Sequence, residues 1–185
     1  MKRLAVLVFA VVLFTGCTGK NPELERAMTL RAKLLASDCS FDTEVSADYG
    51  DQVFTFGITC EGDSDGRLEF LVIAPESISG ITGIAEQDSG KLTFTDTALT
   101  FPLLADGQVS PVSAPYLLMK TLRGGYLTAA GMEGELLRLT IDDSFEEDAL
   151  QLDIWLNGQD QPVQADILYD GRRILTMTVS NFQIL

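Results

Sequence analysis

The sequence predicts an α+β fold in which two helices pack against one antiparallel sheet. Three observations lead to this class. A segment with helical periodicity follows a capping signal at Asn21, and a second apolar segment over 110–123 ends at a pair of glycines. The rest of the chain alternates apolar and polar residues in short runs that turn residues separate. Few of these runs are separated by a helix that could serve as a parallel crossover, so neighbouring strands should pair antiparallel.

The first helix is predicted over 21–36. Asn21 is a favoured N-cap residue, Pro22 suits the first helical position, and Glu23 places a carboxylate in the first turn. Apolar residues then recur at helical spacing, namely Leu24, Ala27, Met28, Leu34 and Leu35. We expect this apolar face to pack on the sheet. A helix lying on a membrane surface is the alternative, but the segment lacks the Lys- and Arg-rich polar face of such helices.

A β-hairpin is predicted next, because apolar residues alternate with polar ones over 41–49 and again over 54–60. Tyr49 and Gly50 fit a two-residue turn. That turn predicts a register in which Val45 pairs with Phe54, Phe41 with Ile58, and Cys39 with Cys60. Because the signal described below leads to an oxidising compartment, the same register predicts a disulfide between Cys39 and Cys60.

Further elements follow in the middle of the chain. Residues 67–74 form a strand candidate with apolar residues on both sides, so we expect both of its faces to be covered. Two more strands are predicted at 81–86 and 92–101. From 110 to 123, leucines recur on one side of the segment, which predicts the second helix.

The C-terminal third is the most regular part of the chain. Four strands are predicted there, at 136–141, 150–156, 162–169 and 173–185. An acidic stretch separates the first two, and Asn-Gly and Asp-Gly turns separate the others. These strands should form an antiparallel meander.

Residues 1–16 have the features of a secretory signal, with two basic residues, an apolar run and small residues before Cys17. The apolar run is shorter than the roughly 20 residues that a membrane-spanning helix needs. The junction Phe14-Thr15-Gly16-Cys17 resembles the lipobox of bacterial lipoproteins, in which cleavage precedes the cysteine and the thiol carries a diacylglyceryl group. The resemblance implies lipidation of Cys17, with palmitate among the acyl chains.

The domain organisation follows from this signal. We expect a signal peptide over 1–16, a lipidated tether over 17–20 and a single domain over 21–185, anchored to the cell membrane outside the cytoplasm. Without the signal, 11 basic and 27 acidic residues remain, a formal charge of −16. Such a surface repels nucleic acid and anionic headgroups, so no nucleic-acid partner is expected and attachment should depend on the lipid.

The order of the predicted elements resembles the LolA/LolB-like superfamily. The segments that resemble its C-terminal half most are Leu150-Gln-Leu-Asp-Ile-Trp-Leu-Asn157, Gln161-Pro-Val-Gln-Ala-Asp-Ile-Leu-Tyr-Asp-Gly171 and Arg172-Arg-Ile-Leu-Thr-Met-Thr-Val-Ser-Asn-Phe182. With the lipobox in front, the chain looks most similar to clostridial membrane lipoproteins, including those of spore germination. The resemblance implies a sheet curled into a half-barrel, with the N-terminal and middle helices on its concave face. None of the family's functional residues can be matched to this sequence.

The resemblance also implies a hydrophobic cavity that receives an acyl chain or docks an envelope protein. Tentative lining residues on the inward side of the strands are Val45, Phe54, Phe56, Ile58, Phe70 and Ile154. A fully packed core and a purely structural or regulatory interaction module are the alternatives.

An enzyme is the less favoured class. The chain has no histidine, and the GxSxG and HExxH patterns are absent, so neither a catalytic nor a metal site is expected and no cofactor is implied. The adjacent acids Asp142 and Asp143, and Glu146 and Glu147, are the candidates for a carboxylate-based hydrolase, but acids on such an acidic loop are usually solvated.

Overall fold

The computed structural model describes residues 21–48, 52–86, 89–94, 97–102, 104–105, 108–146 and 149–185. Its helical elements are α2 (Pro22–Ala36), η1 (Glu76–Ile78), η2 (Pro111–Ser113) and α3 (Ala114–Gly124). Its strands are β1 (Cys39–Asp48), β2 (Val53–Gly62), β3 (Leu68–Ala74), β4 (Thr82–Glu86), β5 (Ser89–Phe94), β6 (Thr97–Pro102), β7 (Leu104–Ala105), β8 (Gln108–Val109), β9 (Tyr126–Glu133), β10 (Leu136–Asp142), β11 (Leu150–Leu156), β12 (Pro162–Tyr169) and β13 (Arg172–Ile184).

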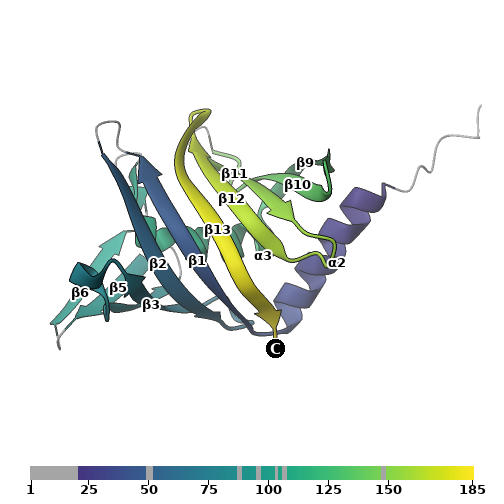
Figure 1. The fold of residues 1–185 in the computed structure, drawn as a ribbon. Helices are drawn as coiled ribbons and strands as arrows, with labels where there is room; N and C mark the ends of the chain where they lie inside the picture. Colours follow the sequence, from purple (N-terminus) through teal and green to yellow (C-terminus); the bar gives the residue numbers. More distant parts are fainter. Residues whose placement is uncertain are drawn as a thin grey trace, which may run out of the picture.

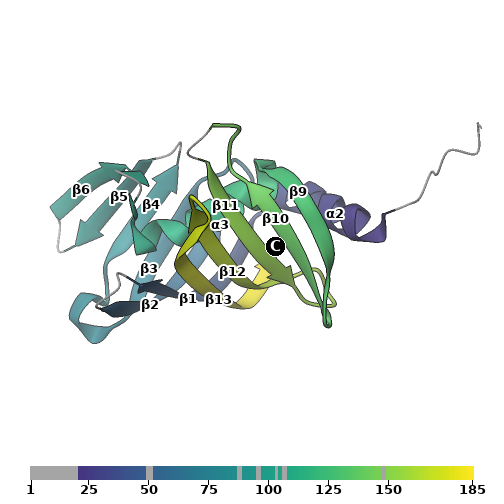
Figure 2. The same cartoon turned by 90° about the horizontal axis from the view of Figure 1, so that it is seen from above.

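Two antiparallel meanders join to form one sheet of 11 strands, in the order β6-β5-β4-β3-β2-β1-β13-β12-β11-β10-β9. The pairing of β1 with β13 connects the two meanders, so β6 and β9 are the edges. The sheet curls without closing, and α2 and α3 lie on its concave side (Figures 1 and 2). The predicted α+β class, with a curled antiparallel sheet and two helices, is confirmed.

Alternate residues of the strands point into the concave side, where the core lies. From α2, the residues Ala27, Leu30 and Leu34 are buried there, and α3 is buried along most of its length. The largest fully buried side chains of the sheet include Phe41, Ile58, Leu68, Leu139, Leu152 and Ile154. The two helices therefore cover the concave face of the sheet.

Helix α2 begins as its capping signal predicts, since the Asn21 Oδ1 accepts a hydrogen bond of 3.0 Å from the Leu24 amide. Its apolar residues, however, do not all face the core. Leu24, Met28 and Leu35 are exposed, with 43%, 48% and 54% of their surface accessible. The predicted single apolar face is therefore wrong, because the helix carries one buried stripe and one exposed stripe.

The register of the first hairpin differs from the predicted one by two residues. Phe41 pairs with Cys60, Val45 with Phe56, and Cys39 with Gly62. A shift of two leaves every side chain on its predicted face, because side chains alternate with a period of two. The predicted turn at Tyr49 and Gly50 lies outside the described residues.

The sheet differs from the prediction at two other places. The stretch 92–101 contains parts of two strands, β5 and β6, instead of one. Strand β9 was not predicted at all, although it forms an edge of the sheet and pairs with β10.

Strand β3 is covered on one face only. Its residues Leu68, Phe70 and Val72 are buried, whereas Leu71 and Ile73 are 39% and 50% exposed. The prediction of cover on both faces is therefore wrong, and this part of the convex face carries apolar side chains in solvent. Within the described residues, no helix has the length and apolar character required to cross a membrane.

Candidate functional site

The six residues predicted to line an apolar cavity do not share one environment. Four are buried in the hydrophobic core, namely Val45, Ile58, Phe70 and Ile154. Phe56 is half-buried and packs against that core, while Phe54 is 44% exposed near the start of β2. Phe70 also lines the open groove described below, and the other five residues do not. The cavity on the concave side stays a prediction.

Two arginines hold the helices together over the core by binding each other's C-terminal ends. The Arg31 guanidinium of α2 donates to the carbonyls of Leu122 and Gly125, at 2.9 and 2.8 Å. In return, Nε of Arg123 in α3 donates to the carbonyl of Leu34 at 3.0 Å. The last carbonyls of a helix lack hydrogen-bond partners within the helix and carry partial negative charge. Each arginine therefore donates hydrogen bonds to these carbonyls of the other helix and places a positive charge beside them. Burial lowers the pKa of Arg31 from its ordinary value.

Cys39 and Cys60 are free thiols in the structure, so the predicted disulfide is not formed there. The physical reason lies in the register, which places Cys39 opposite Gly62 and Cys60 opposite Phe41. Both thiols are buried on the concave side. Burial raises the pKa of Cys60 well above its ordinary value, and repulsion from Asp42 and Cys39 adds to the effect. Such thiols are poor nucleophiles, because the thiolate is the reactive form.

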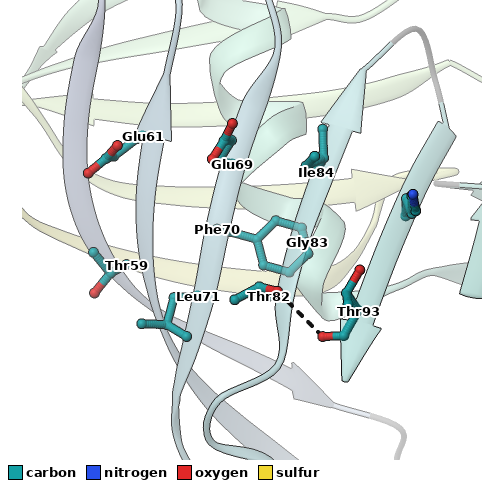
Figure 3. A pocket seen from close by; sticks show the side chains of 10 residues that line it. Thr59, Glu61, Glu69, Phe70, Leu71, Thr82, Gly83, Ile84 and Thr93 are labelled. Atoms are coloured by element: carbon teal, nitrogen blue, oxygen red, sulfur yellow. Dashed lines mark hydrogen bonds between the residues drawn. The ribbon is translucent and has the colours of Figure 1, made fainter. Parts of the chain in front are cut away.

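An open groove of about 480 Å³ crosses the convex face over β2, β3, β4 and β5. Its lining is mixed: the apolar residues are Phe70, whose ring is buried toward the core, and Leu71 and Ile84, and the polar and small residues are Thr59, Glu61, Glu69, Thr82, Gly83, Lys91 and Thr93 (Figure 3). Most of these residues alternate with buried ones along their strands, so their side chains point away from the helices. The groove is therefore separated from the core by the sheet.

The β3–β4 pair beneath the groove depends on a glycine. Gly83 lies directly opposite Phe70, and a Cβ at position 83 would collide with the Phe70 ring (Figure 3). Across the next pair, Thr82 Oγ1 donates a long hydrogen bond of 3.5 Å to the Thr93 carbonyl. At one end of the groove, Arg67 and Glu69 form an ion pair of 2.7 Å in which both side chains remain exposed.

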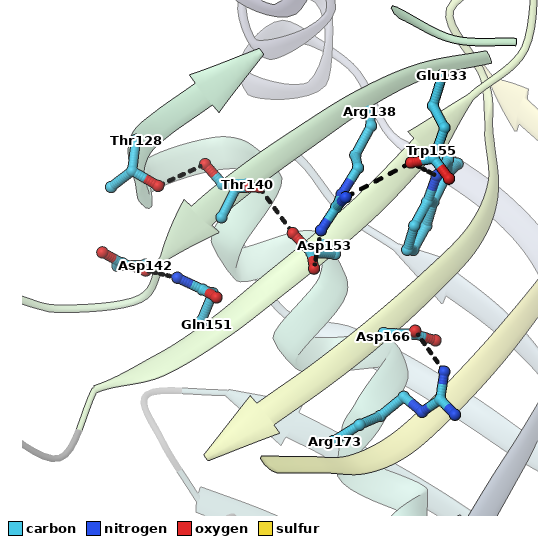
Figure 4. Close-up of polar contacts among 10 residues, drawn as sticks. All are labelled: Thr128, Glu133, Arg138, Thr140, Asp142, Gln151, Asp153, Trp155, Asp166 and Arg173. Atoms are coloured by element: carbon cyan, nitrogen blue, oxygen red, sulfur yellow. Dashed lines mark hydrogen bonds and ion pairs between the residues drawn. The ribbon is translucent and has the colours of Figure 1, made fainter. Parts of the chain in front are cut away.

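The opposite half of the convex face is occupied by paired polar groups (Figure 4). The buried carboxylate of Asp153 accepts hydrogen bonds of 2.7 Å from both Arg138 and Thr140. Arg138 also lies over the Trp155 ring, 5.3 Å from its centroid, and Trp155 Nε1 donates to Glu133 at 3.1 Å. The hydrogen bond to Asp153 raises the pKa of Arg138. These polar side chains have partners within the sheet, whereas the groove presents apolar side chains to solvent.

A second open pocket of about 560 Å³ lies between the β2–β3 turn and the ends of the two helices. Its lining includes Asp63 and Asp65 as well as Lys120 and Arg123. Because the lining contains both acidic and basic side chains, the pocket favours no ligand of one charge.

Of the acids considered for a hydrolase, Asp142 and Asp143 accept hydrogen bonds within the fold, whereas Glu146 is exposed. The Asp143 carboxylate accepts a hydrogen bond of 2.8 Å from the Leu150 amide, and Asp142 accepts one of 3.2 Å from the Gln151 side chain. Glu147 lies outside the described residues. Within the described chain, no group of three or more His, Cys, Asp and Glu side chains is placed to hold a metal ion. Cys17 lies outside the described residues, so its lipidation stays a prediction.

Comparisons with known proteins extend the description of the fold. No protein-family model matches the sequence, and no curated protein is significantly similar to it. Among solved structures, an uncharacterised conserved protein from Thermus thermophilus matches with a TM-score of 0.50 and 10% identity, over 88% of this chain and 87% of that one. At this identity the match shows a shared fold alone.

Two weaker matches carry descriptive names. A putative outer membrane lipoprotein-sorting protein domain from Vibrio parahaemolyticus matches with a TM-score of 0.49 and 8% identity, over 88% of this chain and 92% of that one. The LolA superfamily protein NE2245 from Nitrosomonas europaea matches with a TM-score of 0.44 and 6% identity, over 86% of this chain and 93% of that one. The second of these structures is described as that of a LolA-superfamily protein. The resemblance to clostridial lipoproteins stays a prediction.

Proposed function

We propose that the protein is a lipid-anchored extracytoplasmic lipoprotein without catalytic activity, whose domain docks a segment of an envelope protein in the groove over β2–β5. The observation that carries the proposal is an open groove of about 480 Å³ on the convex face in which Leu71 is exposed and Ile84 is half-buried, beside the carboxylates of Glu61 and Glu69. Apolar side chains exposed in a concave site are a common sign of a binding surface.

The lining indicates the chemistry of the partner. Leu71 and Ile84 would receive an apolar side chain, and the exposed carboxylate of Glu61 would favour a cationic residue beside it. The net charge of the mature chain acts in the same direction, because it attracts cationic partners at long range. We therefore expect the docked segment to combine apolar and basic residues, and its binding to weaken as salt increases.

Photocrosslinking in intact membranes tests this site. A photoreactive amino acid at Leu71 should give one discrete adduct with an envelope protein. The same amino acid at Thr178, an exposed position of the convex face in β13, should not give that adduct.

A pair of charge reversals gives the matched control. Glu61→Lys and Glu44→Lys each change the charge by two units at an exposed position of the convex face, on adjacent strands. The Leu71 adduct should fall severalfold with Glu61→Lys and persist with Glu44→Lys. Equal loss with both variants, or an equal adduct from Thr178, would exclude the groove as the docking site.

An acyl chain bound on the concave side is the second candidate. It is favoured by the incomplete burial of Phe54 and Phe56 along β2. An acyl-chain probe that binds saturably should raise the unfolding temperature of the mature domain, and Phe56→Trp should weaken that binding. If the probe binds saturably, and if Phe56→Trp abolishes this binding while Glu61→Lys leaves it intact, the functional site is the concave interior of the sheet and not the groove.

A further inference from the structure

Helix α2 carries an exposed apolar stripe that core packing does not explain. Leu24, Met28 and Leu35 are each about half exposed, although they belong to a helix whose other side is buried in the core. At 3.6 residues per turn, the three side chains fall within an arc of about 40° on the helix surface. They therefore form one line along the axis, distinct from the buried line of Ala27, Leu30 and Leu34.

Polar contacts on both sides of the helix fix its rotation. Arg31 binds the carbonyls at the end of α3, and Arg26 donates to the Asp160 carboxylate at 2.7 Å and to the Asn157 carbonyl at 3.2 Å in the β11–β12 turn. Rolling the helix to bury Leu24 and Met28 would break both sets of contacts. The stripe is consequently held outward by the fold.

The position of the predicted anchor identifies what covers the stripe. Three residues lie between Cys17 and Asn21, so four Cα-to-Cα steps join them, and an extended chain of that length spans at most about 14 Å. A lipid on Cys17 would therefore hold the first turn of α2, and Leu24 with it, at the surface of the bilayer. This step rests on the lipid anchor included in the proposed function.

We infer that the stripe Leu24, Met28 and Leu35 lies on the lipid surface, so that α2 sits in the membrane interface. A second copy of the chain fits less well, since three half-exposed side chains fall far short of the roughly 800 Å² per partner that a stable interface buries. Electrostatic binding is excluded by the formal charge of the mature chain, so the contact is apolar.

This contact orients the whole domain. Helix α2 contacts β9, which forms one edge of the sheet, whereas the groove lies over β2–β5 toward the other edge (Figure 1). With α2 on the bilayer, the groove remains in solution and accessible to a partner that approaches from outside the membrane.

Site-specific fluorescence on the lipidated full-length protein tests the inference. Met28→Cys and Lys33→Cys place one label each on opposite sides of α2, and both native positions are exposed. Cys39 and Cys60 are at most 1% exposed and do not compete for the dye. The protein is reconstituted into phosphatidylcholine vesicles with and without a spin-labelled lipid that quenches in the headgroup and upper acyl region. We expect severalfold stronger quenching at position 28 than at position 33.

Three outcomes would overturn the inference. Equal quenching at the two positions would show that the stripe does not contact the bilayer selectively. A label at Leu24→Cys, which lies in the same stripe, tests this result independently. A dye at position 28 that is already shielded without vesicles would indicate a second copy as the occupant. Protein that fails to float with the vesicles would overturn the lipid anchor as well, whereas floating protein without selective quenching overturns only the membrane contact of α2.

Discussion

The thiol of Cys60 makes stability depend on pH at the scale of one residue. Burial raises its pKa in the folded protein, while the unfolded chain has the ordinary thiol pKa of about 8.5. The unfolded state therefore loses its proton first as pH rises. The protonated Cys60 thiol therefore makes its full contribution to the free energy of unfolding below about pH 8.5. Above that pH, this contribution declines by on the order of 1 kcal/mol per pH unit.

A substitution isolates this effect from other titrating groups. Urea unfolding of the wild type and of Cys60→Ala is compared between pH 7 and pH 10, where tyrosines and lysines affect both proteins alike. The free energy of unfolding should fall more steeply with pH in the wild type. Parallel slopes would show that Cys60 is not a buried thiol. Thiol titration of the denatured, unreduced mature domain should also give two free thiols. A result of no free thiols would instead support the disulfide that the sequence predicts between Cys39 and Cys60.

At the scale of elements, the α2–α3 pair depends on Arg31. Removing its side chain leaves the carbonyls of Leu122 and Gly125 without a charged donor. Because hydrogen bonds from charged groups contribute about 1.5–3 kcal/mol, Arg31→Ala should lower the free energy of unfolding by about 2 kcal/mol in urea denaturation. Arg31→Lys should restore only part of it, since an ammonium cannot reproduce the guanidinium fork. The control is Lys33→Ala in the same turn, which should change stability by less than about 0.5 kcal/mol.

The β3–β4 pair makes a second prediction at this scale. Gly83→Ala would force the added methyl against the Phe70 ring and should cost about 1–3 kcal/mol of stability. Adding Phe70→Leu should recover part of this loss, which a double-mutant cycle measures as coupling between the two sites. Gly131→Ala in the edge strand β9 is the control, because a Cβ there meets nothing within 4 Å. Strictly additive effects would show that the ring does not pack on the glycine.

At the scale of the whole molecule, the sequence predicted what local signals encode. The cap at Asn21 located α2, and the alternation of apolar residues located most strands. The register of the first hairpin was predicted wrongly because a slip of two residues leaves the same side chains on the inward and outward faces, so the apolar pattern fits both registers. Strand β9 was not predicted because its side chains show no regular alternation of burial. It is also an edge strand, and its pairing with β10 is interrupted by a register shift between Thr140 and Ile141.

The candidate surfaces were less predictable, because exposure depends on neighbours that are distant in sequence. The apolar run of β3 is typical of a strand covered on both faces. Leu71 is exposed because no helix or strand of the described residues covers the convex side of this part of the sheet (Figure 1). Likewise, the helical spacing in α2 assigns Leu24 and Met28 to the core face. Which stripe faces inward depends on the long-range contacts of Arg26 and Arg31, and these cannot be read from the spacing.

The last prediction concerns how the molecule is held at the membrane. Cys17→Ser should release the domain into the soluble fraction and abolish incorporation of radiolabelled palmitate. Release should be nearly complete even at low salt, because the formal charge of −16 repels anionic headgroups and a short apolar stripe is too weak to hold the domain without a lipid. An ordinary secretory signal placed before Thr18 is the control, since it removes the lipid without leaving an uncleaved signal. If that secreted domain still sediments with membranes, attachment depends on the protein surface and the lipid anchor is dispensable.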